Sequence, residues 1–385
     1  MSLNDLSIYF KPVDFTFQQT KELLSEKITI YTEEFPEIEK NSIVIFDCPE
    51  FRNSVSGKGD LIPNRFRHYL YNLSADTKWN FSVYDLGTIK PGDAVEDTYY
   101  AVQEAVSILV KKSCVPIVIG GSQDLTYAIY KAFQQLEQTV NIAGIDAGLD
   151  LGNPDEPLND QNYISHILTS RPCTLFNYSI IGTQQPFLRT SDVDLIEKLY
   201  FDYCRLGELA ADFKKAEPLI RNSDIISFDL KSLKAIQSRS GFYDNPNGIT
   251  SETACQIAKY AGISDRLSCF SVMNYLEGDS GLTDHLVAQM IWYFIDGFAS
   301  RFGDFPISSL KNYMKFTVNL VDIGEEIVFY KSNKSQRWWM EVPYPKKSEM
   351  NFKRHTVVPC NHEDYLQAMK NDVPDLWWKT FQKLL

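Results

Sequence analysis

The amino-acid sequence predicts an α/β protein: a three-layer α/β/α sandwich on a mainly parallel sheet, followed by an α+β appendage. Two observations lead to this prediction. Short, continuously apolar runs alternate with amphipathic helical stretches between about residues 42 and 300, as expected for a parallel sheet covered on both faces. Three runs end in acidic or glycine-rich turns, VIGGSQD (118–124), GIDAGLD (144–150) and ISFDLKS (226–232). In such sheets ligands bind beyond the carboxyl ends of the strands.

Seven apolar runs are predicted as strands: SIVIFDC (42–48), FSVYDLG (81–87), VPIVIGG (115–121), NIAGIDA (141–147), YSIIGTQ (178–184), DIISFDL (224–230) and CFSVMNY (269–275). Residues 95–112 and 284–298 are predicted as helices, because apolar side chains recur along one stripe of each. After about residue 305, four short apolar runs and two helical stretches rich in tryptophan and tyrosine follow. We therefore divide the chain into an N-terminal extension (1–40), an α/β domain (41–305) and an aromatic-rich appendage packed on that domain (306–385).

Composition limits the partners and the compartment. The 385 residues have a net charge of −12, which repels nucleic acid and anionic membranes, so we expect neither as a partner. The N-terminus lacks the basic-then-apolar order of a secretory signal, and no apolar run reaches the roughly 18 residues of a membrane helix. The seven cysteines are dispersed without a CxxC pair, which is typical of reduced thiols in a cytoplasmic protein.

Polar residues gather at the ends of the predicted strands. Asp146 and Asp150 lie four residues apart across one turn, and Asp229 and Lys231 lie two apart after another strand. If that strand persists, Asp229 and Lys231 leave the same face. Gln123 follows a Gly-Gly turn. Each residue alone is typical of a turn, but three converging carboxylates repel one another and need a cation or protons to coexist.

Taken together, residues 42–300 resemble the ureohydrolase superfamily, which contains arginase, agmatinase and formimidoylglutamase. VIGGSQDLTYA looks like the family's strand ending in GGDHS, IDAGLD like its DAHxD and SFDLKSL like its SxDxDxxDP. FRNSVSGKGDLIPNRFRHYL (51–70) looks like its early glycine-bearing loop, and GDSGLT (278–283) like the segment before its long helix. The resemblance implies an arginase-like fold. In the family, two Mn²⁺ ions share six ligands from the three strand-end motifs, and a bridging hydroxide attacks the guanidinium or formimino carbon of the substrate.

Carried over residue by residue, the resemblance implies an altered site. The family's aspartate ligands fall on Asp146, Asp150 and Asp229, but its two histidine ligands fall on Gln123 and Gly148. Its last aspartate ligand falls on Lys231, whose ammonium cannot bind a metal while charged.

Two further family positions also differ. Ser122 stands in place of an aspartate, and a late acidic position falls on Val272 or Asn274, with Glu277 nearby.

The remaining charges leave two arrangements open. Three aspartates and one lysine carry a net charge of −2, which one divalent ion would neutralise. In the first arrangement, Gln123, Asp146, Asp150 and Asp229 hold a single Mg²⁺, Ca²⁺ or Mn²⁺ ion, and Lys231 substitutes for the second ion. In the other, no metal binds, Lys231 bridges Asp146 and Asp229, and one carboxyl group is protonated. A binuclear manganese centre is not expected.

Two functions follow from these arrangements. A non-catalytic protein of this fold would bind a small ligand or a partner protein through the cleft that holds the metal ions in the family. A hydrolase of an amidine, guanidine or amide would resemble formimidoylglutamase and use one ion or none. His166, which follows Asp150, is the one candidate for proton transfer, although a histidine there is more typical of surface or helix packing. The tail tryptophans are expected to be buried against the main domain, and the sequence leaves oligomerisation open.

Overall fold

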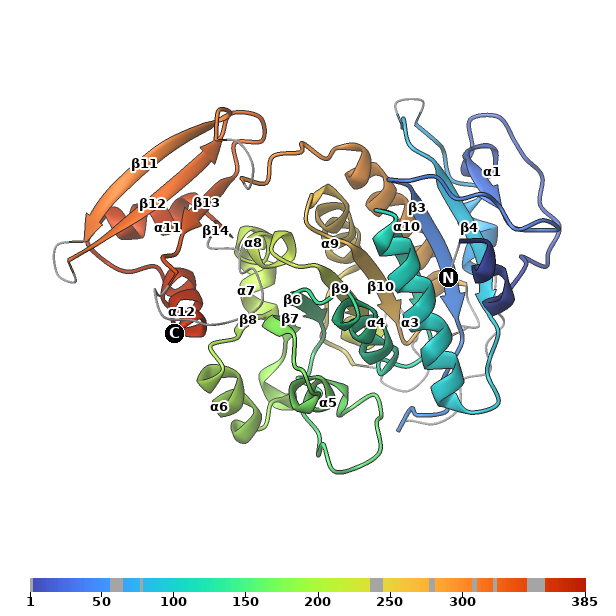
Figure 1. Cartoon of the computed structure of the whole chain (residues 1–385), viewed down its shortest axis with the longest axis horizontal. Coiled ribbons are helices and arrows are strands. Elements are labelled where there is room, and N and C mark those ends of the chain that lie inside the picture. The colour runs from blue at the N-terminus through green and yellow to red at the C-terminus, as the bar shows by residue number, and fades with distance from the viewer. Residues whose placement is uncertain are drawn as a thin grey trace.

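The computed structural model of the chain (Figure 1) describes residues 3–55, 65–76, 79–235, 245–276, 281–306, 310–320, 324–344 and 357–385. Within these residues the chain forms two separate sheets. The larger, mainly parallel sheet lies among helices, and the smaller antiparallel sheet lies at one end of the molecule, near the C-terminus. The predicted α/β/α sandwich and α+β tail are therefore confirmed.

The strands of the large sheet are β1 (Phe10–Lys11), β2 (Ile28–Ile30), β3 (Ile43–Cys48), β4 (Val83–Ile89), β5 (Val115–Gly120), β6 (Val140–Ile145), β7 (Leu175–Thr183), β8 (Asp202–Arg205), β9 (Ile225–Asp229) and β10 (Cys269–Met273). Their order is β1-β4-β3-β5-β10-β9-β6-β7-β8, with β2 also on β4. Every pair is parallel except β1 with β4. All seven predicted strands are present. The sequence did not reveal β1, β2 and β8, because runs of two to four residues are too short to show a period.

The helices of this part are α1 (Leu24–Lys27), α2 (Arg65–Leu70), α3 (Val95–Lys111), α4 (Leu125–Gln134), α5 (Tyr163–Thr169), α6 (Thr190–Lys198), α7 (Leu206–Ala211), α8 (Glu217–Arg221), α9 (Ser251–Ile263) and α10 (Leu282–Ala299). Short 3₁₀ turns occur at η1 (Leu3–Tyr9), η2 (Gln185–Phe187), η3 (Phe213–Lys215) and η4 (Leu230–Ser232). Apolar residues of α3 to α6 form one core cluster with the sheet, and those of α2 and α7 to α10 form the other.

The two core clusters explain why the strands are apolar at consecutive positions. In β3, Ile43 and Ile45 belong to the cluster with α2, α9 and α10. Val44, Phe46 and Cys48 belong to the cluster with α3 and α4. Because successive side chains of a strand point to opposite faces, a strand covered on both faces needs apolar residues at both.

The first 40 residues are tied into the large sheet. β1 pairs with β4 from Phe10 to Lys11, and β2 pairs with β4 from Ile28 to Ile30. Leu6, Phe10 and Ile38 are buried in the main core. The division of the chain at residues 40 and 305 stays a prediction.

The smaller sheet consists of β11 (Tyr313–Leu320), β12 (Glu325–Ser332), β13 (Trp338–Glu341) and β14 (Val357–Cys360), paired antiparallel in chain order. Helices α11 (His362–Met369) and α12 (Asp375–Leu384) follow it. Its core contains Phe329, Met340 and Trp377. Trp338, Trp339 and Trp377 are buried, whereas Trp378 is 49% exposed.

Arg221 of α8 joins the large sheet's helical layer to the smaller sheet. Its guanidinium donates hydrogen bonds to the carbonyl oxygens of Trp338 and Cys360, both at 3.0 Å. It lies over the Trp339 ring, 4.6 Å from the centroid, and forms an ion pair with Glu217 at 2.8 Å. Because Arg221 is buried, these carbonyl groups have little access to water that could replace it.

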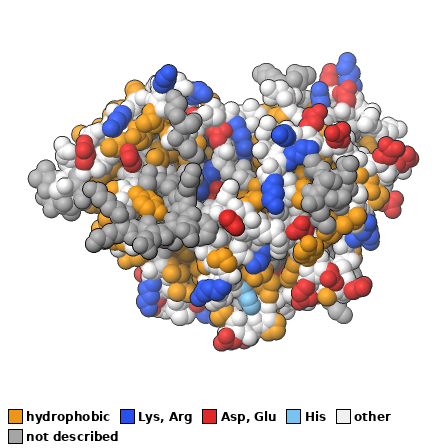
Figure 2. Space-filling view, in the orientation of Figure 1, with side chains coloured by type: hydrophobic (Ala, Val, Ile, Leu, Met, Phe, Trp, Pro, Cys, Tyr) orange, Lys and Arg blue, Asp and Glu red, His pale blue; other side chains and the backbone are white. Residues whose placement is uncertain are grey.

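None of the described helices is long and apolar enough to cross a membrane. On the face drawn in Figure 2, acidic and basic side chains are interspersed with apolar ones.

We predict that Arg221→Ala lowers the free energy of unfolding by about 3 kcal/mol, because two buried carbonyl groups and Glu217 lose their partner. Urea denaturation measures the change. Arg171→Ala is the control: Arg171 is exposed and bonds the carbonyl groups of Thr169 and Ser170, so its loss should cost less than about 0.5 kcal/mol. Equal effects of the two substitutions would contradict the role of Arg221.

Candidate functional site

A cavity of about 530 Å³ opens beyond the carboxyl ends of β6 and β9. Its walls carry five aspartates, one lysine and one arginine, together with apolar and amide side chains. The lining residues are Asp146, Ala147, Gly148, Leu149, Asp150, Leu151, Gly152, Asp160, Gln161, Phe187, Arg189, Asp192, Asp229, Lys231, Asn245 and Pro246. The structure therefore brings together Asp146, Asp150, Asp229 and Lys231, four of the residues predicted from the strand-end motifs.

Asp146 and Asp150 lie within hydrogen-bonding distance of each other in the turn after β6. Burial, followed by the charge of Asp146, raises the pKa of Asp150 well above its usual range. Burial also raises the pKa of Asp146, although the hydrogen bond from Asp150 acts in the opposite direction. Asp146 Oδ1 accepts the backbone N–H groups of Ala147 at 2.5 Å and Gly148 at 3.3 Å. The pair is therefore most stable with a proton on Asp150.

Asp229 is the last residue of β9 and is 3% exposed. Its Oδ1 accepts the backbone N–H of Lys231 at 2.7 Å, and its Oδ2 accepts Asn274 Nδ2 at 2.8 Å. Burial, followed by the charge of Asp146, raises the pKa of Asp229 to about 7. The strand does not persist to Lys231: it turns into η4 at Leu230. Of the two residues considered for the late acidic position, Asn274 is the one that contacts Asp229.

Lys231 forms an ion pair with Asp160, at 3.0 Å from Nζ to Oδ2. Asp160 lies in the loop after β6 and is 2% exposed. In the metal-free arrangement expected from the sequence, this ammonium bridges Asp146 and Asp229; the ion pair with Asp160 corrects that expectation. Burial lowers the pKa of Lys231, but the carboxylates of Asp229 and Asp160 outweigh it, and the net shift is upward. Lys231 is therefore a cation fixed in the wall of the cavity.

No motif marks Asp160 in the sequence, where it stands in the polar run LNDQN. The signal that could have pointed to it is physical. A lysine that is largely shielded from water needs a carboxylate partner, and the loop after Asp150 is the nearest unassigned acidic stretch.

Gln123 is buried and is absent from the described lining residues of the cavity. Its Nε2 donates to Ser227 Oγ at 3.0 Å and to the Tyr163 hydroxyl at 3.4 Å. Its Oε1 is buried and has no hydrogen-bond partner among the described residues, and the same holds for Asp150 Oδ2. The predicted metal ligand Gln123 is thus held by neighbouring hydroxyl groups.

His166 is placed away from the carboxylates. It lies on α5, outside the described lining of the cavity, and its Nε2 contacts the backbone carbonyl of Glu156 at 3.0 Å. The Ser122 hydroxyl donates a hydrogen bond to the Asp124 carboxylate. Gly148 has room for a side chain, because a Cβ atom built there meets nothing within 4 Å. Glu277 and residues 56–64 and 278–280 of the resembling segments lie outside the described residues.

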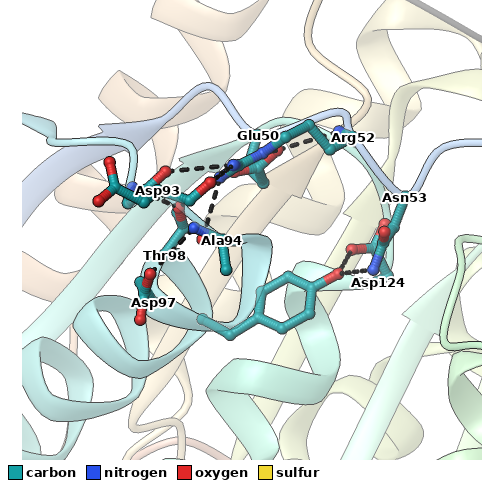
Figure 3. Close-up of polar contacts among 10 residues, drawn as sticks. Glu50, Arg52, Asn53, Asp93, Ala94, Asp97, Thr98 and Asp124 are labelled. Atoms are coloured by element: carbon teal, nitrogen blue, oxygen red, sulfur yellow. Dashed lines mark hydrogen bonds and ion pairs between the residues drawn. The ribbon is translucent and has the colours of Figure 1, made fainter.

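A polar cluster beside the cavity was not found from the sequence (Figure 3). Arg52 forms an ion pair with Glu50 and donates to the carbonyl groups of Gly92 and Asp93 before α3, at 3.1 and 2.9 Å. Asn53 Nδ2 donates to the Tyr99 hydroxyl at 2.8 Å, and that hydroxyl donates to Asp124. This cluster fixes the segment that follows β3.

The donor set does not fit a two-metal centre. No group of three or more His, Cys, Asp or Glu side chains in the described parts of the chain is arranged to hold a metal ion. Both oxygens of Asp229 and Oδ1 of Asp146 accept hydrogen bonds from protein N–H groups. The Lys231 ammonium occupies the same cavity. The carboxylate oxygens in the cavity wall can instead accept hydrogen bonds from a positively charged group of a ligand.

We predict that Asp150→Asn stabilises the chain at high pH. An unfolded aspartate has a pKa of about 3.9, whereas Asp229 has a folded-state pKa of about 7 and Asp150 is also raised. The folded chain therefore binds more protons across this window, so the free energy of unfolding falls as the pH rises from about 4 to about 7. With a chelator present, Asp150→Asn should add about 1–3 kcal/mol at pH 8 and little at pH 4.5.

Thermal denaturation at the two pH values measures this difference. Asp160→Asn is the matched control and should destabilise the chain, because it removes the negative charge that lies 3.0 Å from the Lys231 ammonium. A loss of stability in Asp150→Asn at pH 8 would show that its charge is compensated.

The sequence and the fold of the chain are similar to those of known proteins. The model of the arginase family matches residues 50–295. An uncharacterized 32.2 kDa protein of Methanothermus fervidus is 34% identical over 85 residues, which cover 22% of this chain and 29% of that protein. The chain thus spans under a third of that relative's length.

Solved structures share the fold at low identity. A Trypanosoma cruzi formiminoglutamase with Mn²⁺ has a TM-score of 0.61 at 18% identity, covering 67% of this chain and 94% of that one. A Bacillus subtilis formimidoylglutamase has a TM-score of 0.65 at 15% identity, covering 77% and 98%. An arginase from Medicago truncatula has a TM-score of 0.55 at 14% identity, covering 68% and 87%. Since the family model matches residues 50–295 of 385, the chain belongs to the arginase family.

Proposed function

We propose that this chain is an arginase-fold protein that works without a binuclear manganese centre and binds a small molecule in its cleft. The observation that carries the proposal is the Lys231–Asp160 ion pair inside the cavity. A fixed ammonium beside the strand-end carboxylates supplies positive charge where a second metal ion would otherwise be needed, and it repels such an ion.

The charges of the cavity favour a ligand with a cationic, hydrogen-donating group. Asp146 and Asp229 line the inner wall, and Lys231 is paired with Asp160. An amidinium, guanidinium or ammonium group can donate hydrogen bonds to these carboxylates and neutralise them. The volume of about 530 Å³ is in the usual range of small-molecule sites, roughly 300–1,000 Å³.

The mouth of the cavity offers different chemistry. Phe187 is 53% exposed there. Arg189 is also exposed, and its side chain makes no hydrogen bond or ion pair with other residues in the described ranges. Asp192 lies beside it on α6. The mouth can therefore contact an apolar body and a carboxylate of a ligand whose cationic end lies inside.

The proposal predicts fewer than one manganese ion per chain after incubation with excess MnCl₂ and removal of free metal, measured by elemental analysis. The triple substitution Gln123→His, Gly148→His and Lys231→Asp should raise that number, because it adds two imidazoles and removes the ammonium.

Gly207→His is the control for an added histidine, since Gly207 also has open space around it, and it should leave the manganese content unchanged. Two ions bound to the unaltered chain would refute the proposal.

A second candidate function is hydrolysis of a C–N bond in an amidine or guanidine. One observation favours it: the buried oxygens Gln123 Oε1 and Asp150 Oδ2 have no hydrogen-bond partner among the described residues. Such oxygens, together with the carboxylates of Asp146 and Asp229, are the hard ligands that Mg²⁺, Ca²⁺ or Mn²⁺ prefer.

A panel of agmatine, L-arginine and N-formimidoyl-L-glutamate separates binding from hydrolysis. We predict that at least one compound raises the melting temperature by more than about 2 °C, because a ligand that binds the folded state stabilises it. We also predict that none releases ammonia, urea or formamide. Product release that disappears in Asp146→Asn would establish the hydrolase instead.

A further inference from the structure

Asp160 connects two parts of the chain that are far apart in sequence. Its Oδ2 accepts Lys231 Nζ and the Ser54 hydroxyl, each at 3.0 Å. Its Oδ1 accepts the backbone N–H of Val55 at 2.9 Å. The carboxylate is 2% exposed, so these protein groups satisfy it in place of water.

Other side chains of the segment Glu50–Val55 also hold it in place, through contacts with α3 and the residues before it (Figure 3). Arg52 is held by Glu50 and by the carbonyl groups before α3, and its Nη2 also reaches Thr98 Oγ1 at 3.0 Å. Asn53 is held by Tyr99 of α3. Asp160 is therefore the point where the cavity wall meets a segment fastened to α3.

We propose that Asp160 is a positioning residue: it fixes the Lys231 ammonium in the cavity wall, and with the same carboxylate it holds the segment Glu50–Val55 beside the cleft. The first half of this inference rests on the proposed function, because it concerns how the cavity receives a cationic ligand. The second half stands on the hydrogen bonds alone.

The two roles of Asp160 depend on different properties of its side chain. Lys231 requires the negative charge, whereas Ser54 and Val55 require a hydrogen-bond acceptor. Asparagine keeps the oxygen that accepts the Val55 amide, but it loses the charge and replaces the oxygen that accepts Lys231 and Ser54 with an amide donor. Alanine keeps neither the acceptor nor the charge. Removing Lys231 leaves the buried Asp160 carboxylate without its counter-charge, which weakens the local structure around it.

Hydrogen exchange at the Val55 amide reports on the segment. Asp160→Ala should accelerate its exchange at least about tenfold, whereas Asp160→Asn should keep it within about threefold of the unaltered chain. Lys231→Met should also accelerate exchange of the Val55 amide, whereas Lys231→Arg, which keeps the positive charge, should leave that exchange slow. Ser54→Ala is the control that removes one contact from Asp160 and leaves the Val55 hydrogen bond.

Affinity for agmatine, measured by calorimetry, reports on the ammonium. Asp160→Asn should weaken binding at least about tenfold, because a Lys231 ammonium that no longer pairs with Asp160 can turn toward Asp146 and Asp229 and compete with a cationic ligand. Ser54→Ala should bind agmatine like the unaltered chain.

The outcomes separate this inference from the proposed function. If the unaltered chain binds neither agmatine nor the other compounds of the panel, the proposed function fails, and the exchange measurements still decide the role of Asp160. If Asp160→Asn and Asp160→Ala behave alike at Val55, or Lys231→Met leaves Val55 exchange unchanged, the positioning role is refuted.

Discussion

Three aspartates line one cavity beyond the carboxyl ends of β6 and β9, and like charges gathered at one site cannot all remain ionised without compensation. Asp146, Asp150 and Asp229 lie in one cavity wall, where burial favours the neutral carboxyl form. We infer that they are compensated by a proton on Asp150, whose pKa is raised, by the hydrogen bond that the Asn274 amide donates to Asp229, and by the nearby ammonium of Lys231. The other features of the cleft follow from this need for positive charge.

The parallel sheet brings the carboxylates together, and a loop residue helps to fix the compensating ammonium. Parallel pairing of β6 with β9 brings Asp146 and Asp229 to the same edge, as in any open α/β sheet. The loop after β6 then supplies Asp160, which binds Lys231 and holds the segment after β3. The chain thus shares the fold of a formiminoglutamase solved with Mn²⁺, and we propose that its own side chains provide the charge balance of the cleft. That combination is what separates the fold, which is shared with formimidoylglutamase and arginase, from the function, which we infer from the site.

The strands could be predicted because burial on both faces leaves an unbroken apolar run, as in Val115–Gly120 and Ile225–Asp229. Asp146, Asp150 and Asp229 could be predicted because they follow such runs directly. Asp160 could not, because it stands in a loop without a pattern and its role depends on a contact 71 residues away. The register of Asn274 was also left open, since it has a positive φ of 57° just beyond β10 and departs from the strand. The short edge strands β1, β2 and β8 are fixed by tertiary pairing, which local periodicity does not reveal.

The central claim is that a proton and an ammonium, in place of bound metal, keep the aspartate cluster stable. Carbon-13 NMR of the chain labelled at the aspartate carboxyl groups, recorded at pH 7 with a chelator, tests it most directly. The account predicts at least one carboxyl signal at the position of a protonated acid, which disappears in the chain with asparagine at position 150 in place of Asp150. A spectrum at pH 7 in which every aspartate carboxyl is ionised would contradict it.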